Sequence, residues 1–423
     1  MKKLLLLVLI FANQVRADSS ALTSDFLSML PRYDLAPKSE QSYCYLQNGE
    51  VSGYQVKKVQ RIASLTKLMT TFFASELLNL NQQFTTKIYI SGTDLHIEGG
   101  RDPYFEEEKF LLLMQSLNDL GYRKFRHVTF NSDFIFTDTA FPSHADITPA
   151  HTQSRLTALM SSRAANLIKP LWKTTSAFAA EEGITLEGAM PSISAAKVSL
   201  TTINPHKNKS PLILIHKSLP LHRILKSMNV MSKNHVAQNI FREASRIQSF
   251  TQFMQARGFP SDSFKVYNGS GLPVEGNRRL DNEASCELIL NLSVMLEESV
   301  LRHQLALSDI LAINGGKDLG SLRTRFLQYP ETHQAVLSKT GTLKHTSSLA
   351  GMLMVEGSVP FAILNHTANT TSARSFQDEF VSRMFHHLGE PSPLEYQKIS
   401  IFPWDGSPFL IPAASSSFAN LIH

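Results

Sequence analysis

Cysteine is scarce in this chain, which has only Cys44 and Cys286 among 423 residues. So few cysteines exclude a disulfide-rich small protein and any C-x-x-C metal or redox motif. In an exported protein the two residues can form one disulfide. Cysteine is also among the residue types most often buried, so the sequence favours two buried thiols and leaves the pairing open.

An excess of charge of one sign is also lacking. Lys and Arg number 41 against 36 Asp and Glu, which gives a net charge of +5. No long run of Lys or Arg occurs, so the clustered basic face of a nucleic-acid-binding protein is not expected. The hydrophobic fraction of 43% excludes a disordered chain. A chain of this length contains about two or three domains.

Long apolar runs are missing as well. The stretch from Leu4 to Ala12 follows two lysines and precedes Val15-Arg16-Ala17, a pattern of small residues before a signal-peptidase site. It predicts a signal peptide over residues 1–17 and a periplasmic or secreted mature protein. The stretch is shorter than the roughly 20 residues that cross a bilayer, so no integral membrane anchor is expected.

Hydrophobic periodicity predicts a mixed α/β protein. Apolar residues recur at helical spacing from Ser64 to Leu80 and again after Leu221, and strand-like alternation occurs between such segments. Between Phe141 and Pro220 the pattern weakens, and only short alternating runs indicate strands. We interpret this weak region as part of an inserted domain.

Three short motifs stand in order along the chain. They are Ser64-Leu65-Thr66-Lys67, Ser232-Lys233-Asn234 and Lys339-Thr340-Gly341. Together they match the S-x-x-K, S-x-N and K-T-G set of serine enzymes that react with penicillin. Each motif alone is weak evidence, because short triplets and quartets recur by chance.

The context of each copy decides which ones matter. Ser64 precedes a helical pattern, and residues three apart on a helix share a face, so the Lys67 amine can reach the Ser64 hydroxyl. A second S-x-x-K begins at Ser194 in a strand-like stretch, where this geometry is not expected, and further S-x-N triplets begin at Ser116 and Ser227. The alternative, that Ser64 is an ordinary helix N-cap, is less economical than three motifs in order.

The segments around these motifs resemble the penicillin-binding protein 4 type of serine D-alanyl-D-alanine carboxypeptidase/endopeptidase. The resemblance is carried by IASLTKLMTTFFASELL, GGRDPYF, MNVMSKNHVAQNIFREA, YNGSGLPVEGNRRL and GSLRTRFLQYPETHQAVLSKTGTLKHTSSLAG. It implies a penicillin-binding/β-lactamase-like transpeptidase catalytic domain, of mixed α/β class, in which helices flank an antiparallel sheet. The long gap between Ser64 and Ser232 predicts an inserted accessory domain.

These expectations divide the chain into four parts. The predicted parts are a signal peptide (1–17), a catalytic domain (18–80 and 221–390), an inserted accessory domain (81–220) and a C-terminal tail (391–423). The inserted domain looks shorter and less regular than those of the family, so it is expected to be reduced.

The resemblance implies an acyl-transfer reaction on peptidoglycan stem peptides. Ser64 would attack the carbonyl between two terminal D-alanines, and water would hydrolyse the resulting acyl-enzyme. Lys67 would accept the Ser64 proton. Because a free lysine has a pKa of about 10.4, this requires desolvation or a second cation, for which Lys339 is expected. Ser232 would relay the proton to the leaving amine, and Asn234 would hold Lys67 and the substrate.

Further roles are implied for the third motif. Thr340, Gly341 and Thr342 are expected to bind substrate, with Lys339 and the hydroxyls receiving its terminal carboxylate. Backbone N–H groups of Ser64 and Thr342 would form the oxyanion hole. No cofactor and no metal are expected, because the chain has no HExxH motif and its 15 histidines are dispersed. Lys233 departs from the acidic or neutral residue common in the family and adds positive charge near the site.

The predicted function is a serine-type D-Ala-D-Ala carboxypeptidase, a D-Ala cross-link endopeptidase, or both, inhibited covalently by β-lactam antibiotics. Two alternatives remain open. A serine β-lactamase shares the acylation chemistry but deacylates β-lactams quickly, and a non-catalytic cell-wall binding protein would keep only the fold. The balance of the two peptidase activities, the preferred wall chemistry and the oligomeric state are not determined by the sequence.

Overall fold

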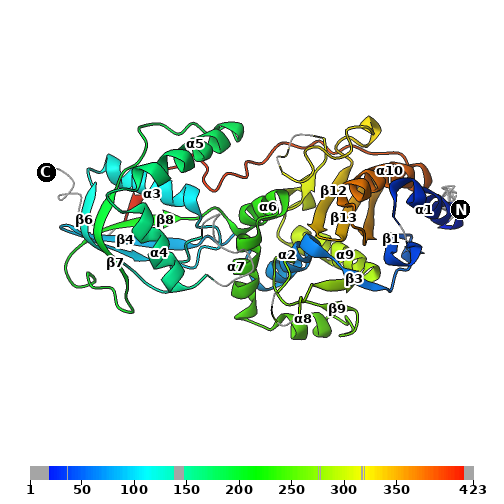
Figure 1. The fold of residues 1–423 in the computed structure, drawn as a ribbon, viewed down its shortest axis with the longest axis horizontal. Helices are drawn as coiled ribbons and strands as arrows, with labels where there is room; N and C mark the ends of the chain where they lie inside the picture. The colour runs from blue at the N-terminus through cyan, green and yellow to red at the C-terminus, as the bar shows by residue number, and fades with distance from the viewer. Residues whose placement is uncertain are drawn as a thin grey trace, which may run out of the picture.

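The computed structural model describes residues 19–413 except for 36, 138–146, 275, 277, 316, 317 and 319. It contains two units arranged along the long axis of the molecule, each built around its own large sheet (Figure 1). The signal peptide predicted over residues 1–17 lies outside the described residues.

The first unit is built around a six-stranded sheet in which all pairings are antiparallel. In spatial order its strands are β11 (Ala312–Ile313), β12 (Val336–Leu343), β13 (Thr346–Val355), β14 (Gly357–Asn365), β1 (Gln41–Gln47) and β2 (Glu50–Tyr54). Because β14 pairs with β1, residues from both ends of the chain form one sheet. The antiparallel sheet predicted from the family resemblance is confirmed.

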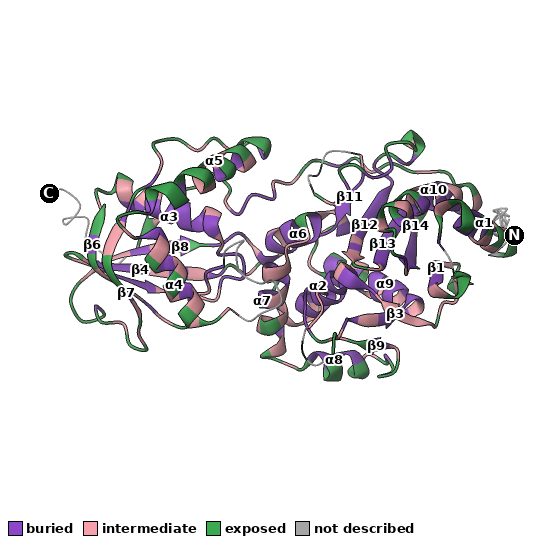
Figure 2. Cartoon of the chain, viewed as in Figure 1, coloured by how far each residue is buried: buried purple, intermediate pink, exposed green. Residues whose placement is uncertain are grey.

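Helices cover both faces of this sheet (Figure 2). On one face lie α1 (Ser19–Met29) and α10 (Thr370–Leu388), whose Phe26 and Phe380 share a core with Leu349 and Phe361 of the sheet. On the other face lie α2 (Thr66–Leu77) and α9 (Cys286–Arg302), in a core with Ala350 and Ala362. Neighbouring residues of one strand enter opposite cores because side chains alternate along a strand.

Further helices and a small sheet complete the first unit. They are η1 (Leu30–Tyr33), η2 (Lys38–Glu40), η3 (Ala63–Leu65), α6 (Leu221–Met231), α7 (Asn234–Ser245), α8 (Phe250–Ala256), η4 (Leu307–Asp309) and η5 (Pro330–Thr332), with the sheet β3 (Val59–Arg61), β10 (Glu283–Ser285) and β9 (Phe264–Lys265). The helix predicted from Ser64 onward is present as η3 followed by α2.

The second unit contains a mixed six-stranded sheet in which β6 lies parallel to both β5 and β7. Its strands, in spatial order, are β15 (Ile411–Pro412), β8 (Leu212–Lys217), β4 (Thr85–Ser91), β5 (Asp94–Glu98), β6 (Lys124–Phe130) and β7 (Ser194–Leu200). Three helices accompany it: α3 (Glu107–Asp119), α4 (Pro149–Leu159) and α5 (Ala165–Glu181).

The weak region between Phe141 and Pro220 is more regular than the sequence indicated. It contains α4 and the 17-residue α5 as well as strands. The expectation of strands alone was wrong because α5 buries only Ile168, Thr175 and Ala179. Pro170 also lies inside α5, and a proline within a helical pattern usually marks a helix end.

The segment after α10 returns to the second unit and joins its sheet. Phe402 and Phe409 are buried in the core of that unit, and β15 pairs with β8. On the way, Tyr396 donates a hydrogen bond of 2.6 Å to Asp318 of the first unit. This segment therefore packs against both units, and Figure 1 shows it crossing between them.

Cys44 and Cys286 form a disulfide between β1 and the first residue of α9. The sequence favoured two buried thiols, and that preference was wrong. Both residues are fully buried, and packing of α9 against the sheet brings their Cα atoms to 6.0 Å of each other. Because the two cysteines are 242 residues apart, no local sequence pattern could predict this contact.

Candidate active site

The three motifs meet at one place in the first unit. Ser64 lies in η3, immediately before α2, and Ser232 lies in the turn between α6 and α7. Lys339 lies in β12, whose partner strand β11 reaches only as far as Ser338. Beyond that residue β12 has β13 on one side, and no described strand pairs with its other edge. The site is therefore built at an open edge of the sheet.

Ser64 is held in a constrained turn. The preceding Ala63 has a φ of 50°, in the left-handed region that side chains disfavour. Gly271 packs directly against it: a Cβ atom there would lie 2.0 Å from the Ala63 carbonyl oxygen. The N-cap positions of η3 and α2 are Ile62 and Leu65, so Ser64 is not at an N-cap position of either helix. A strained backbone held by tight packing is typical of functional positions.

Lys67 is fully buried and points at the Ser64 hydroxyl. Its Nζ atom lies 3.0 Å from Ser64 Oγ, 2.7 Å from Asn234 Oδ1 and 2.7 Å from the Ser270 carbonyl oxygen. All three partners are neutral. Burial lowers the pKa of Lys67 well below its usual value, and the nearby Lys339 charge lowers it further. These are the two causes of a lowered pKa that the sequence led us to expect.

Lys339 is the second fully buried cation of the site. Its Nζ atom donates hydrogen bonds to Ser232 Oγ at 3.0 Å and to the Thr340 carbonyl oxygen at 2.8 Å. Burial lowers the pKa of Lys339 to about 7. No carboxylate among the described residues forms an ion pair with Lys67 or Lys339, so nothing offsets the effect of burial, which favours the neutral form of both amines.

The two polar residues of the S-x-N motif contact both lysines from the turn between α6 and α7. Ser232 has a φ of 55° and ends α6, and Asn234 begins α7. The reversal of the chain between the two helices directs the Ser232 hydroxyl to Lys339 and the Asn234 amide oxygen to Lys67. The five candidate catalytic side chains therefore form two hydrogen-bonded groups, Ser64–Lys67–Asn234 and Ser232–Lys339, which the turn between α6 and α7 brings together.

Gly341 makes a close backbone contact that differs from the one expected. The sequence suggested that the missing side chain lets a substrate approach. A Cβ atom at Gly341 would instead lie 2.2 Å from Ser348 Oγ and 2.6 Å from the Ile62 carbonyl oxygen. Ser348 donates a hydrogen bond of 2.9 Å to that same carbonyl. Gly341 therefore allows the turn that carries Ser64 to pack against β12.

Lys233 does not add uncompensated positive charge to the site. Its Nζ atom lies 2.5 Å from Glu106 Oε2 and 4.9 Å from the centre of the Tyr104 ring. Burial alone lowers the pKa of Lys233, but the charges around it, first that of Glu106, raise the pKa well above its usual value. Both partners follow the GGRD segment at the edge of the second unit, so this loop neutralises Lys233.

Sequence reasoning missed several residues that support the site. The Ser270 carbonyl oxygen binds Lys67, and Asn268 holds this loop by accepting hydrogen bonds from the Ser270 and Gly271 backbones. Asn282 donates to Thr66 and to the Asn268 carbonyl oxygen. The YNGSG segment was the available signal, but a backbone carbonyl carries no mark in a sequence.

The other motif copies lie elsewhere. Ser194 begins β7 of the second unit, as its strand-like context predicted, and Lys197 is exposed there. Ser116 lies on α3. Ser227 is buried in α6, where its hydroxyl donates a hydrogen bond to the Ile401 carbonyl oxygen and accepts one from the Tyr104 hydroxyl. None of these copies takes part in the hydrogen-bonded group around Lys67.

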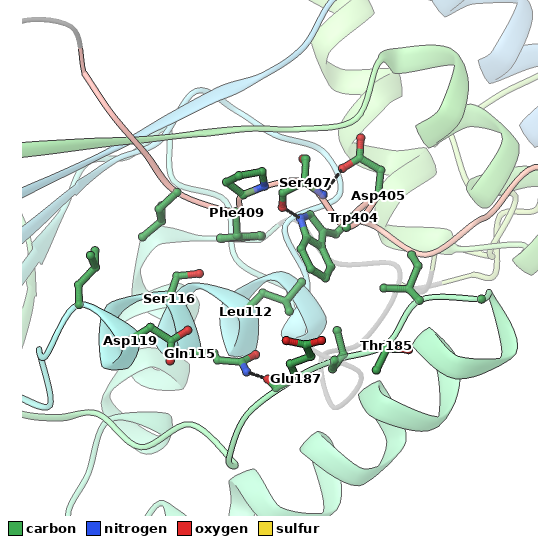
Figure 3. A pocket seen from close by; sticks show the side chains of 17 residues that line it. Leu112, Gln115, Ser116, Asp119, Thr185, Glu187, Trp404, Asp405, Ser407 and Phe409 are labelled. Carbon is green, nitrogen blue, oxygen red and sulfur yellow. Dashed lines mark hydrogen bonds between the residues drawn. The ribbon is translucent and has the colours of Figure 1, made fainter.

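A cavity of about 740 Å³ lies in the second unit (Figure 3). It is bounded by α3, residues 183–187 and the segment from Trp404 to Leu410. Ser116 of the unused S-x-N copy lines it, but no residue of the three motifs around Ser64, Ser232 and Lys339 does, so it is not the site described above. Among the described residues, no group of three or more His, Cys, Asp or Glu side chains is arranged to hold a metal ion. Within the same part of the chain, no helix combines the length and the apolarity needed to span a bilayer.

Residues 46–168 and 180–384 match the model of the D-Ala-D-Ala carboxypeptidase 3 (S13) family. A comparison with curated proteins gives no match.

Several solved structures share the fold. The predatory endopeptidase Bd3459 of Bdellovibrio bacteriovorus, in complex with the immunity protein Bd3460, is 23% identical with a TM-score of 0.78, covering 88% of this chain and 99% of its own. Bd0816 from the same organism gives the same four values. Penicillin-binding protein 4 (dacB) of Haemophilus influenzae is 16% identical with a TM-score of 0.57, covering 88% and 99%.

Proposed function

Since the chain belongs to the D-Ala-D-Ala carboxypeptidase 3 (S13) family, we propose that it is an exported serine DD-peptidase that uses Ser64 to cleave peptide bonds on the carboxyl side of D-alanine in peptidoglycan. The substrates are D-Ala-D-Ala stem ends, D-Ala cross-links, or both. The observation that carries the assignment of Ser64 is the hydrogen bond from Lys67, a buried amine surrounded by neutral acceptors.

Acylation begins with the neutral form of Lys67. Its amine accepts the Ser64 hydroxyl proton while Oγ bonds to the substrate carbonyl carbon. The C–N bond then breaks, and the leaving amine takes up a proton through Ser232, which is hydrogen-bonded to Lys339. Water subsequently attacks the ester, Ser64 regains its proton, and the shortened peptide leaves as a carboxylic acid.

The open edge of β12 is suited to positioning the substrate. An extended peptide can add to an unpaired strand edge through backbone hydrogen bonds. In that position its scissile carbonyl lies close to the turn that carries Ser64, because Gly341 packs that turn against β12. The backbone N–H groups of Ser64 and Thr342 form the proposed oxyanion hole. Removing one donor of this kind costs about 10²–10³ in rate.

Proteins of similar fold support the choice of substrates and inhibitor. Bd3459 is described as a predatory peptidoglycan endopeptidase, and a structure of its penicillin G acylated form is known. We extend both properties to this chain: it acts on peptidoglycan and is acylated by β-lactams. The signal peptide predicted at residues 1–17 would deliver the enzyme to the periplasm or the exterior, where this substrate occurs.

Two assays on the purified mature protein test the proposal. With cross-linked peptidoglycan, released D-alanine reports carboxypeptidase activity and loss of dimeric muropeptides reports endopeptidase activity. With a fluorescent penicillin, wild type and Ser194→Ala should be labelled and Ser64→Ala should not. Equal labelling of the two variants would contradict the nucleophile assignment. Sustained turnover of a chromogenic β-lactam, rather than a burst followed by a stall, would indicate a β-lactamase instead.

A further inference from the structure

An arginine outside the three motifs lies beside the third one. Arg374, in the second turn of α10, is exposed, and its Nη2 atom donates a hydrogen bond of 3.0 Å to Thr342 Oγ1. Thr342 follows Gly341 on the open edge of β12. The Thr342 hydroxyl is one of the groups expected to bind the substrate carboxylate. The hydrogen bond from Arg374 therefore places a guanidinium beside the expected carboxylate position.

Arg374 acts on the Asp378 carboxylate only through its charge, which lowers the pKa that burial raises, and no described residue forms an ion pair with it. Other arginines on this side of the sheet are paired: Arg383 lies 2.9 Å from Glu379, and Arg325 lies 2.7 Å from Asp378. Asp378 is one turn beyond Arg374, but its two oxygens are occupied by Arg325 Nε and the Phe326 backbone N–H.

Lys339 is a poor source of the positive charge that a carboxylate needs. It is fully buried, and its amine already donates to Ser232 and to the Thr340 carbonyl oxygen. With a pKa of about 7, a large share of the Lys339 amines is neutral at physiological pH. A guanidinium, in contrast, remains protonated and offers a planar fork of donors that matches a carboxylate.

We propose that Arg374 and Thr342 together bind the carboxylate next to the scissile bond of the substrate, with Arg374 supplying the positive charge. Because Thr342 Oγ1 accepts the bond from Arg374, its own hydrogen is available to donate to the same carboxylate. The inference rests on the proposed function and changes one part of it: Lys339 tunes the proton transfer, and Arg374 selects substrates that end in a free acid. A carboxylate occupies the corresponding position in penicillins.

Matched substrates separate this role from a structural one. We would compare a peptide that ends in D-Ala-D-Ala with its C-terminal amide, and penicillin G with its methyl ester, on wild type, Arg374→Ala and Arg374→Lys. Arg374→Ala should lower kcat/KM for the free acid about 10- to 100-fold, the usual value of a hydrogen bond to a charged group. It should leave the amide and the ester within about twofold of wild type. Arg374→Lys should recover part of the preference for the acid.

Arg383→Ala is the control variant, because Arg383 lies on the same helix but pairs with Glu379. It should retain the full preference for the acid. A second readout is the pH dependence of the preference in wild type. If Arg374 supplies the charge, the ratio of acid to amide activity stays constant from pH 6 to 9. If Lys339 supplies it, the ratio falls as Lys339 loses its proton near pH 7.

The outcomes distinguish a failure of the proposed function from a failure of the role assigned to Arg374. If wild type neither hydrolyses the peptides nor reacts with penicillin, the proposed function fails. If wild type is active but Arg374→Ala keeps the acid preference, or loses acid and amide activity equally, only the role of Arg374 is overturned.

Discussion

Buried or half-buried lysines occur both in the catalytic centre and at its junction with the second unit, but their partners differ. In the centre, Lys67 and Lys339 bind only hydroxyl, amide and carbonyl oxygens. At the junction, Lys109 lies 2.6 Å from Asp102 and Lys233 lies 2.5 Å from Glu106. A carboxylate favours the protonated amine, whereas burial among neutral groups favours the amine that has lost its proton.

This difference separates two uses of the same side chain. At the junction, the charged pairs hold the loop after β5 between α3 and the S-x-N turn. In the centre, burial lowers the lysine pKa values, no carboxylate among the described partners offsets this, and the neutral form of Lys67 that can act as a base is favoured. Substitutions on either side of this contrast should therefore have different effects.

Removing the central base should have the largest effect. Lys67→Met keeps an apolar side chain of similar length but cannot accept the Ser64 proton. We expect the rate of acylation by penicillin to fall by about 10⁴ or more, as for other nucleophile–base pairs. Stopped-flow measurements of acylation would check this. Lys197→Met, in the second S-x-x-K sequence on β7, is the matched control and should react like wild type.

Breaking a charged pair at the junction should mainly affect stability. Asp102→Asn leaves the fully buried Lys109 without its counter-charge, and an uncompensated buried charge costs about 3–5 kcal/mol. The free energy of unfolding, measured by denaturant titration, should fall by this amount, while the folded variant keeps its penicillin labelling. The double variant Asp102→Asn/Lys109→Met should recover much of the loss. A stable single variant would show that the pair contributes little.

A carboxylate placed in the centre would make it resemble the junction. Asn234→Asp brings a negative charge to the position that now lies 2.7 Å from Lys67. The charge should raise the pKa of Lys67, so that acylation at pH 7 falls about 10- to 100-fold and the acid limb of the pH profile moves to higher pH. Asn234→Ala provides the comparison, since it removes the acceptor without adding charge. An equal shift of the pH profile in both variants would exclude the electrostatic explanation.

The lowered pKa of Lys339 predicts a pH dependence of stability. In the unfolded chain this lysine titrates near 10.4, and in the folded protein it titrates near 7, so between these values the unfolded state binds more protons. The contribution of Lys339 to stability is therefore lowest below pH 7 and grows as the pH rises above it. Wild type should gain up to about 1 kcal/mol per pH unit between pH 7 and 9 relative to Lys339→Met. Parallel stability curves would contradict the lowered pKa.

Local patterns predicted the elements that have strong signals of their own. The helix after Ser64 shows clear apolar periodicity, and the structure contains it as η3 and α2. Helices α4 and α5 were missed because they bury few apolar residues. The disulfide was not predicted either, since Cys44 and Cys286 approach each other only when α9 packs on the sheet.

Some residues of the candidate site were likewise predictable from the sequence, and others were not. The five motif residues could be named from the sequence because their types and order match an acyl-transfer set. Ser270 and Glu106 could not, because one contributes only a backbone carbonyl and the other pairs with a lysine more than a hundred positions away. Arg374 is one of 41 basic residues, and no spacing rule distinguishes it from the others.

The sequence by itself determined which chemical groups are available and which of them are neighbours on one helical turn, as for Ser64 and Lys67. The tertiary structure decided which groups surround them and how well water is excluded. These two factors set the proton affinity of an amine, because a charge is disfavoured by burial and by another cation nearby. Lys67 and Lys339 lie far apart in the chain, so only folding brings them close enough for one to lower the pKa of the other.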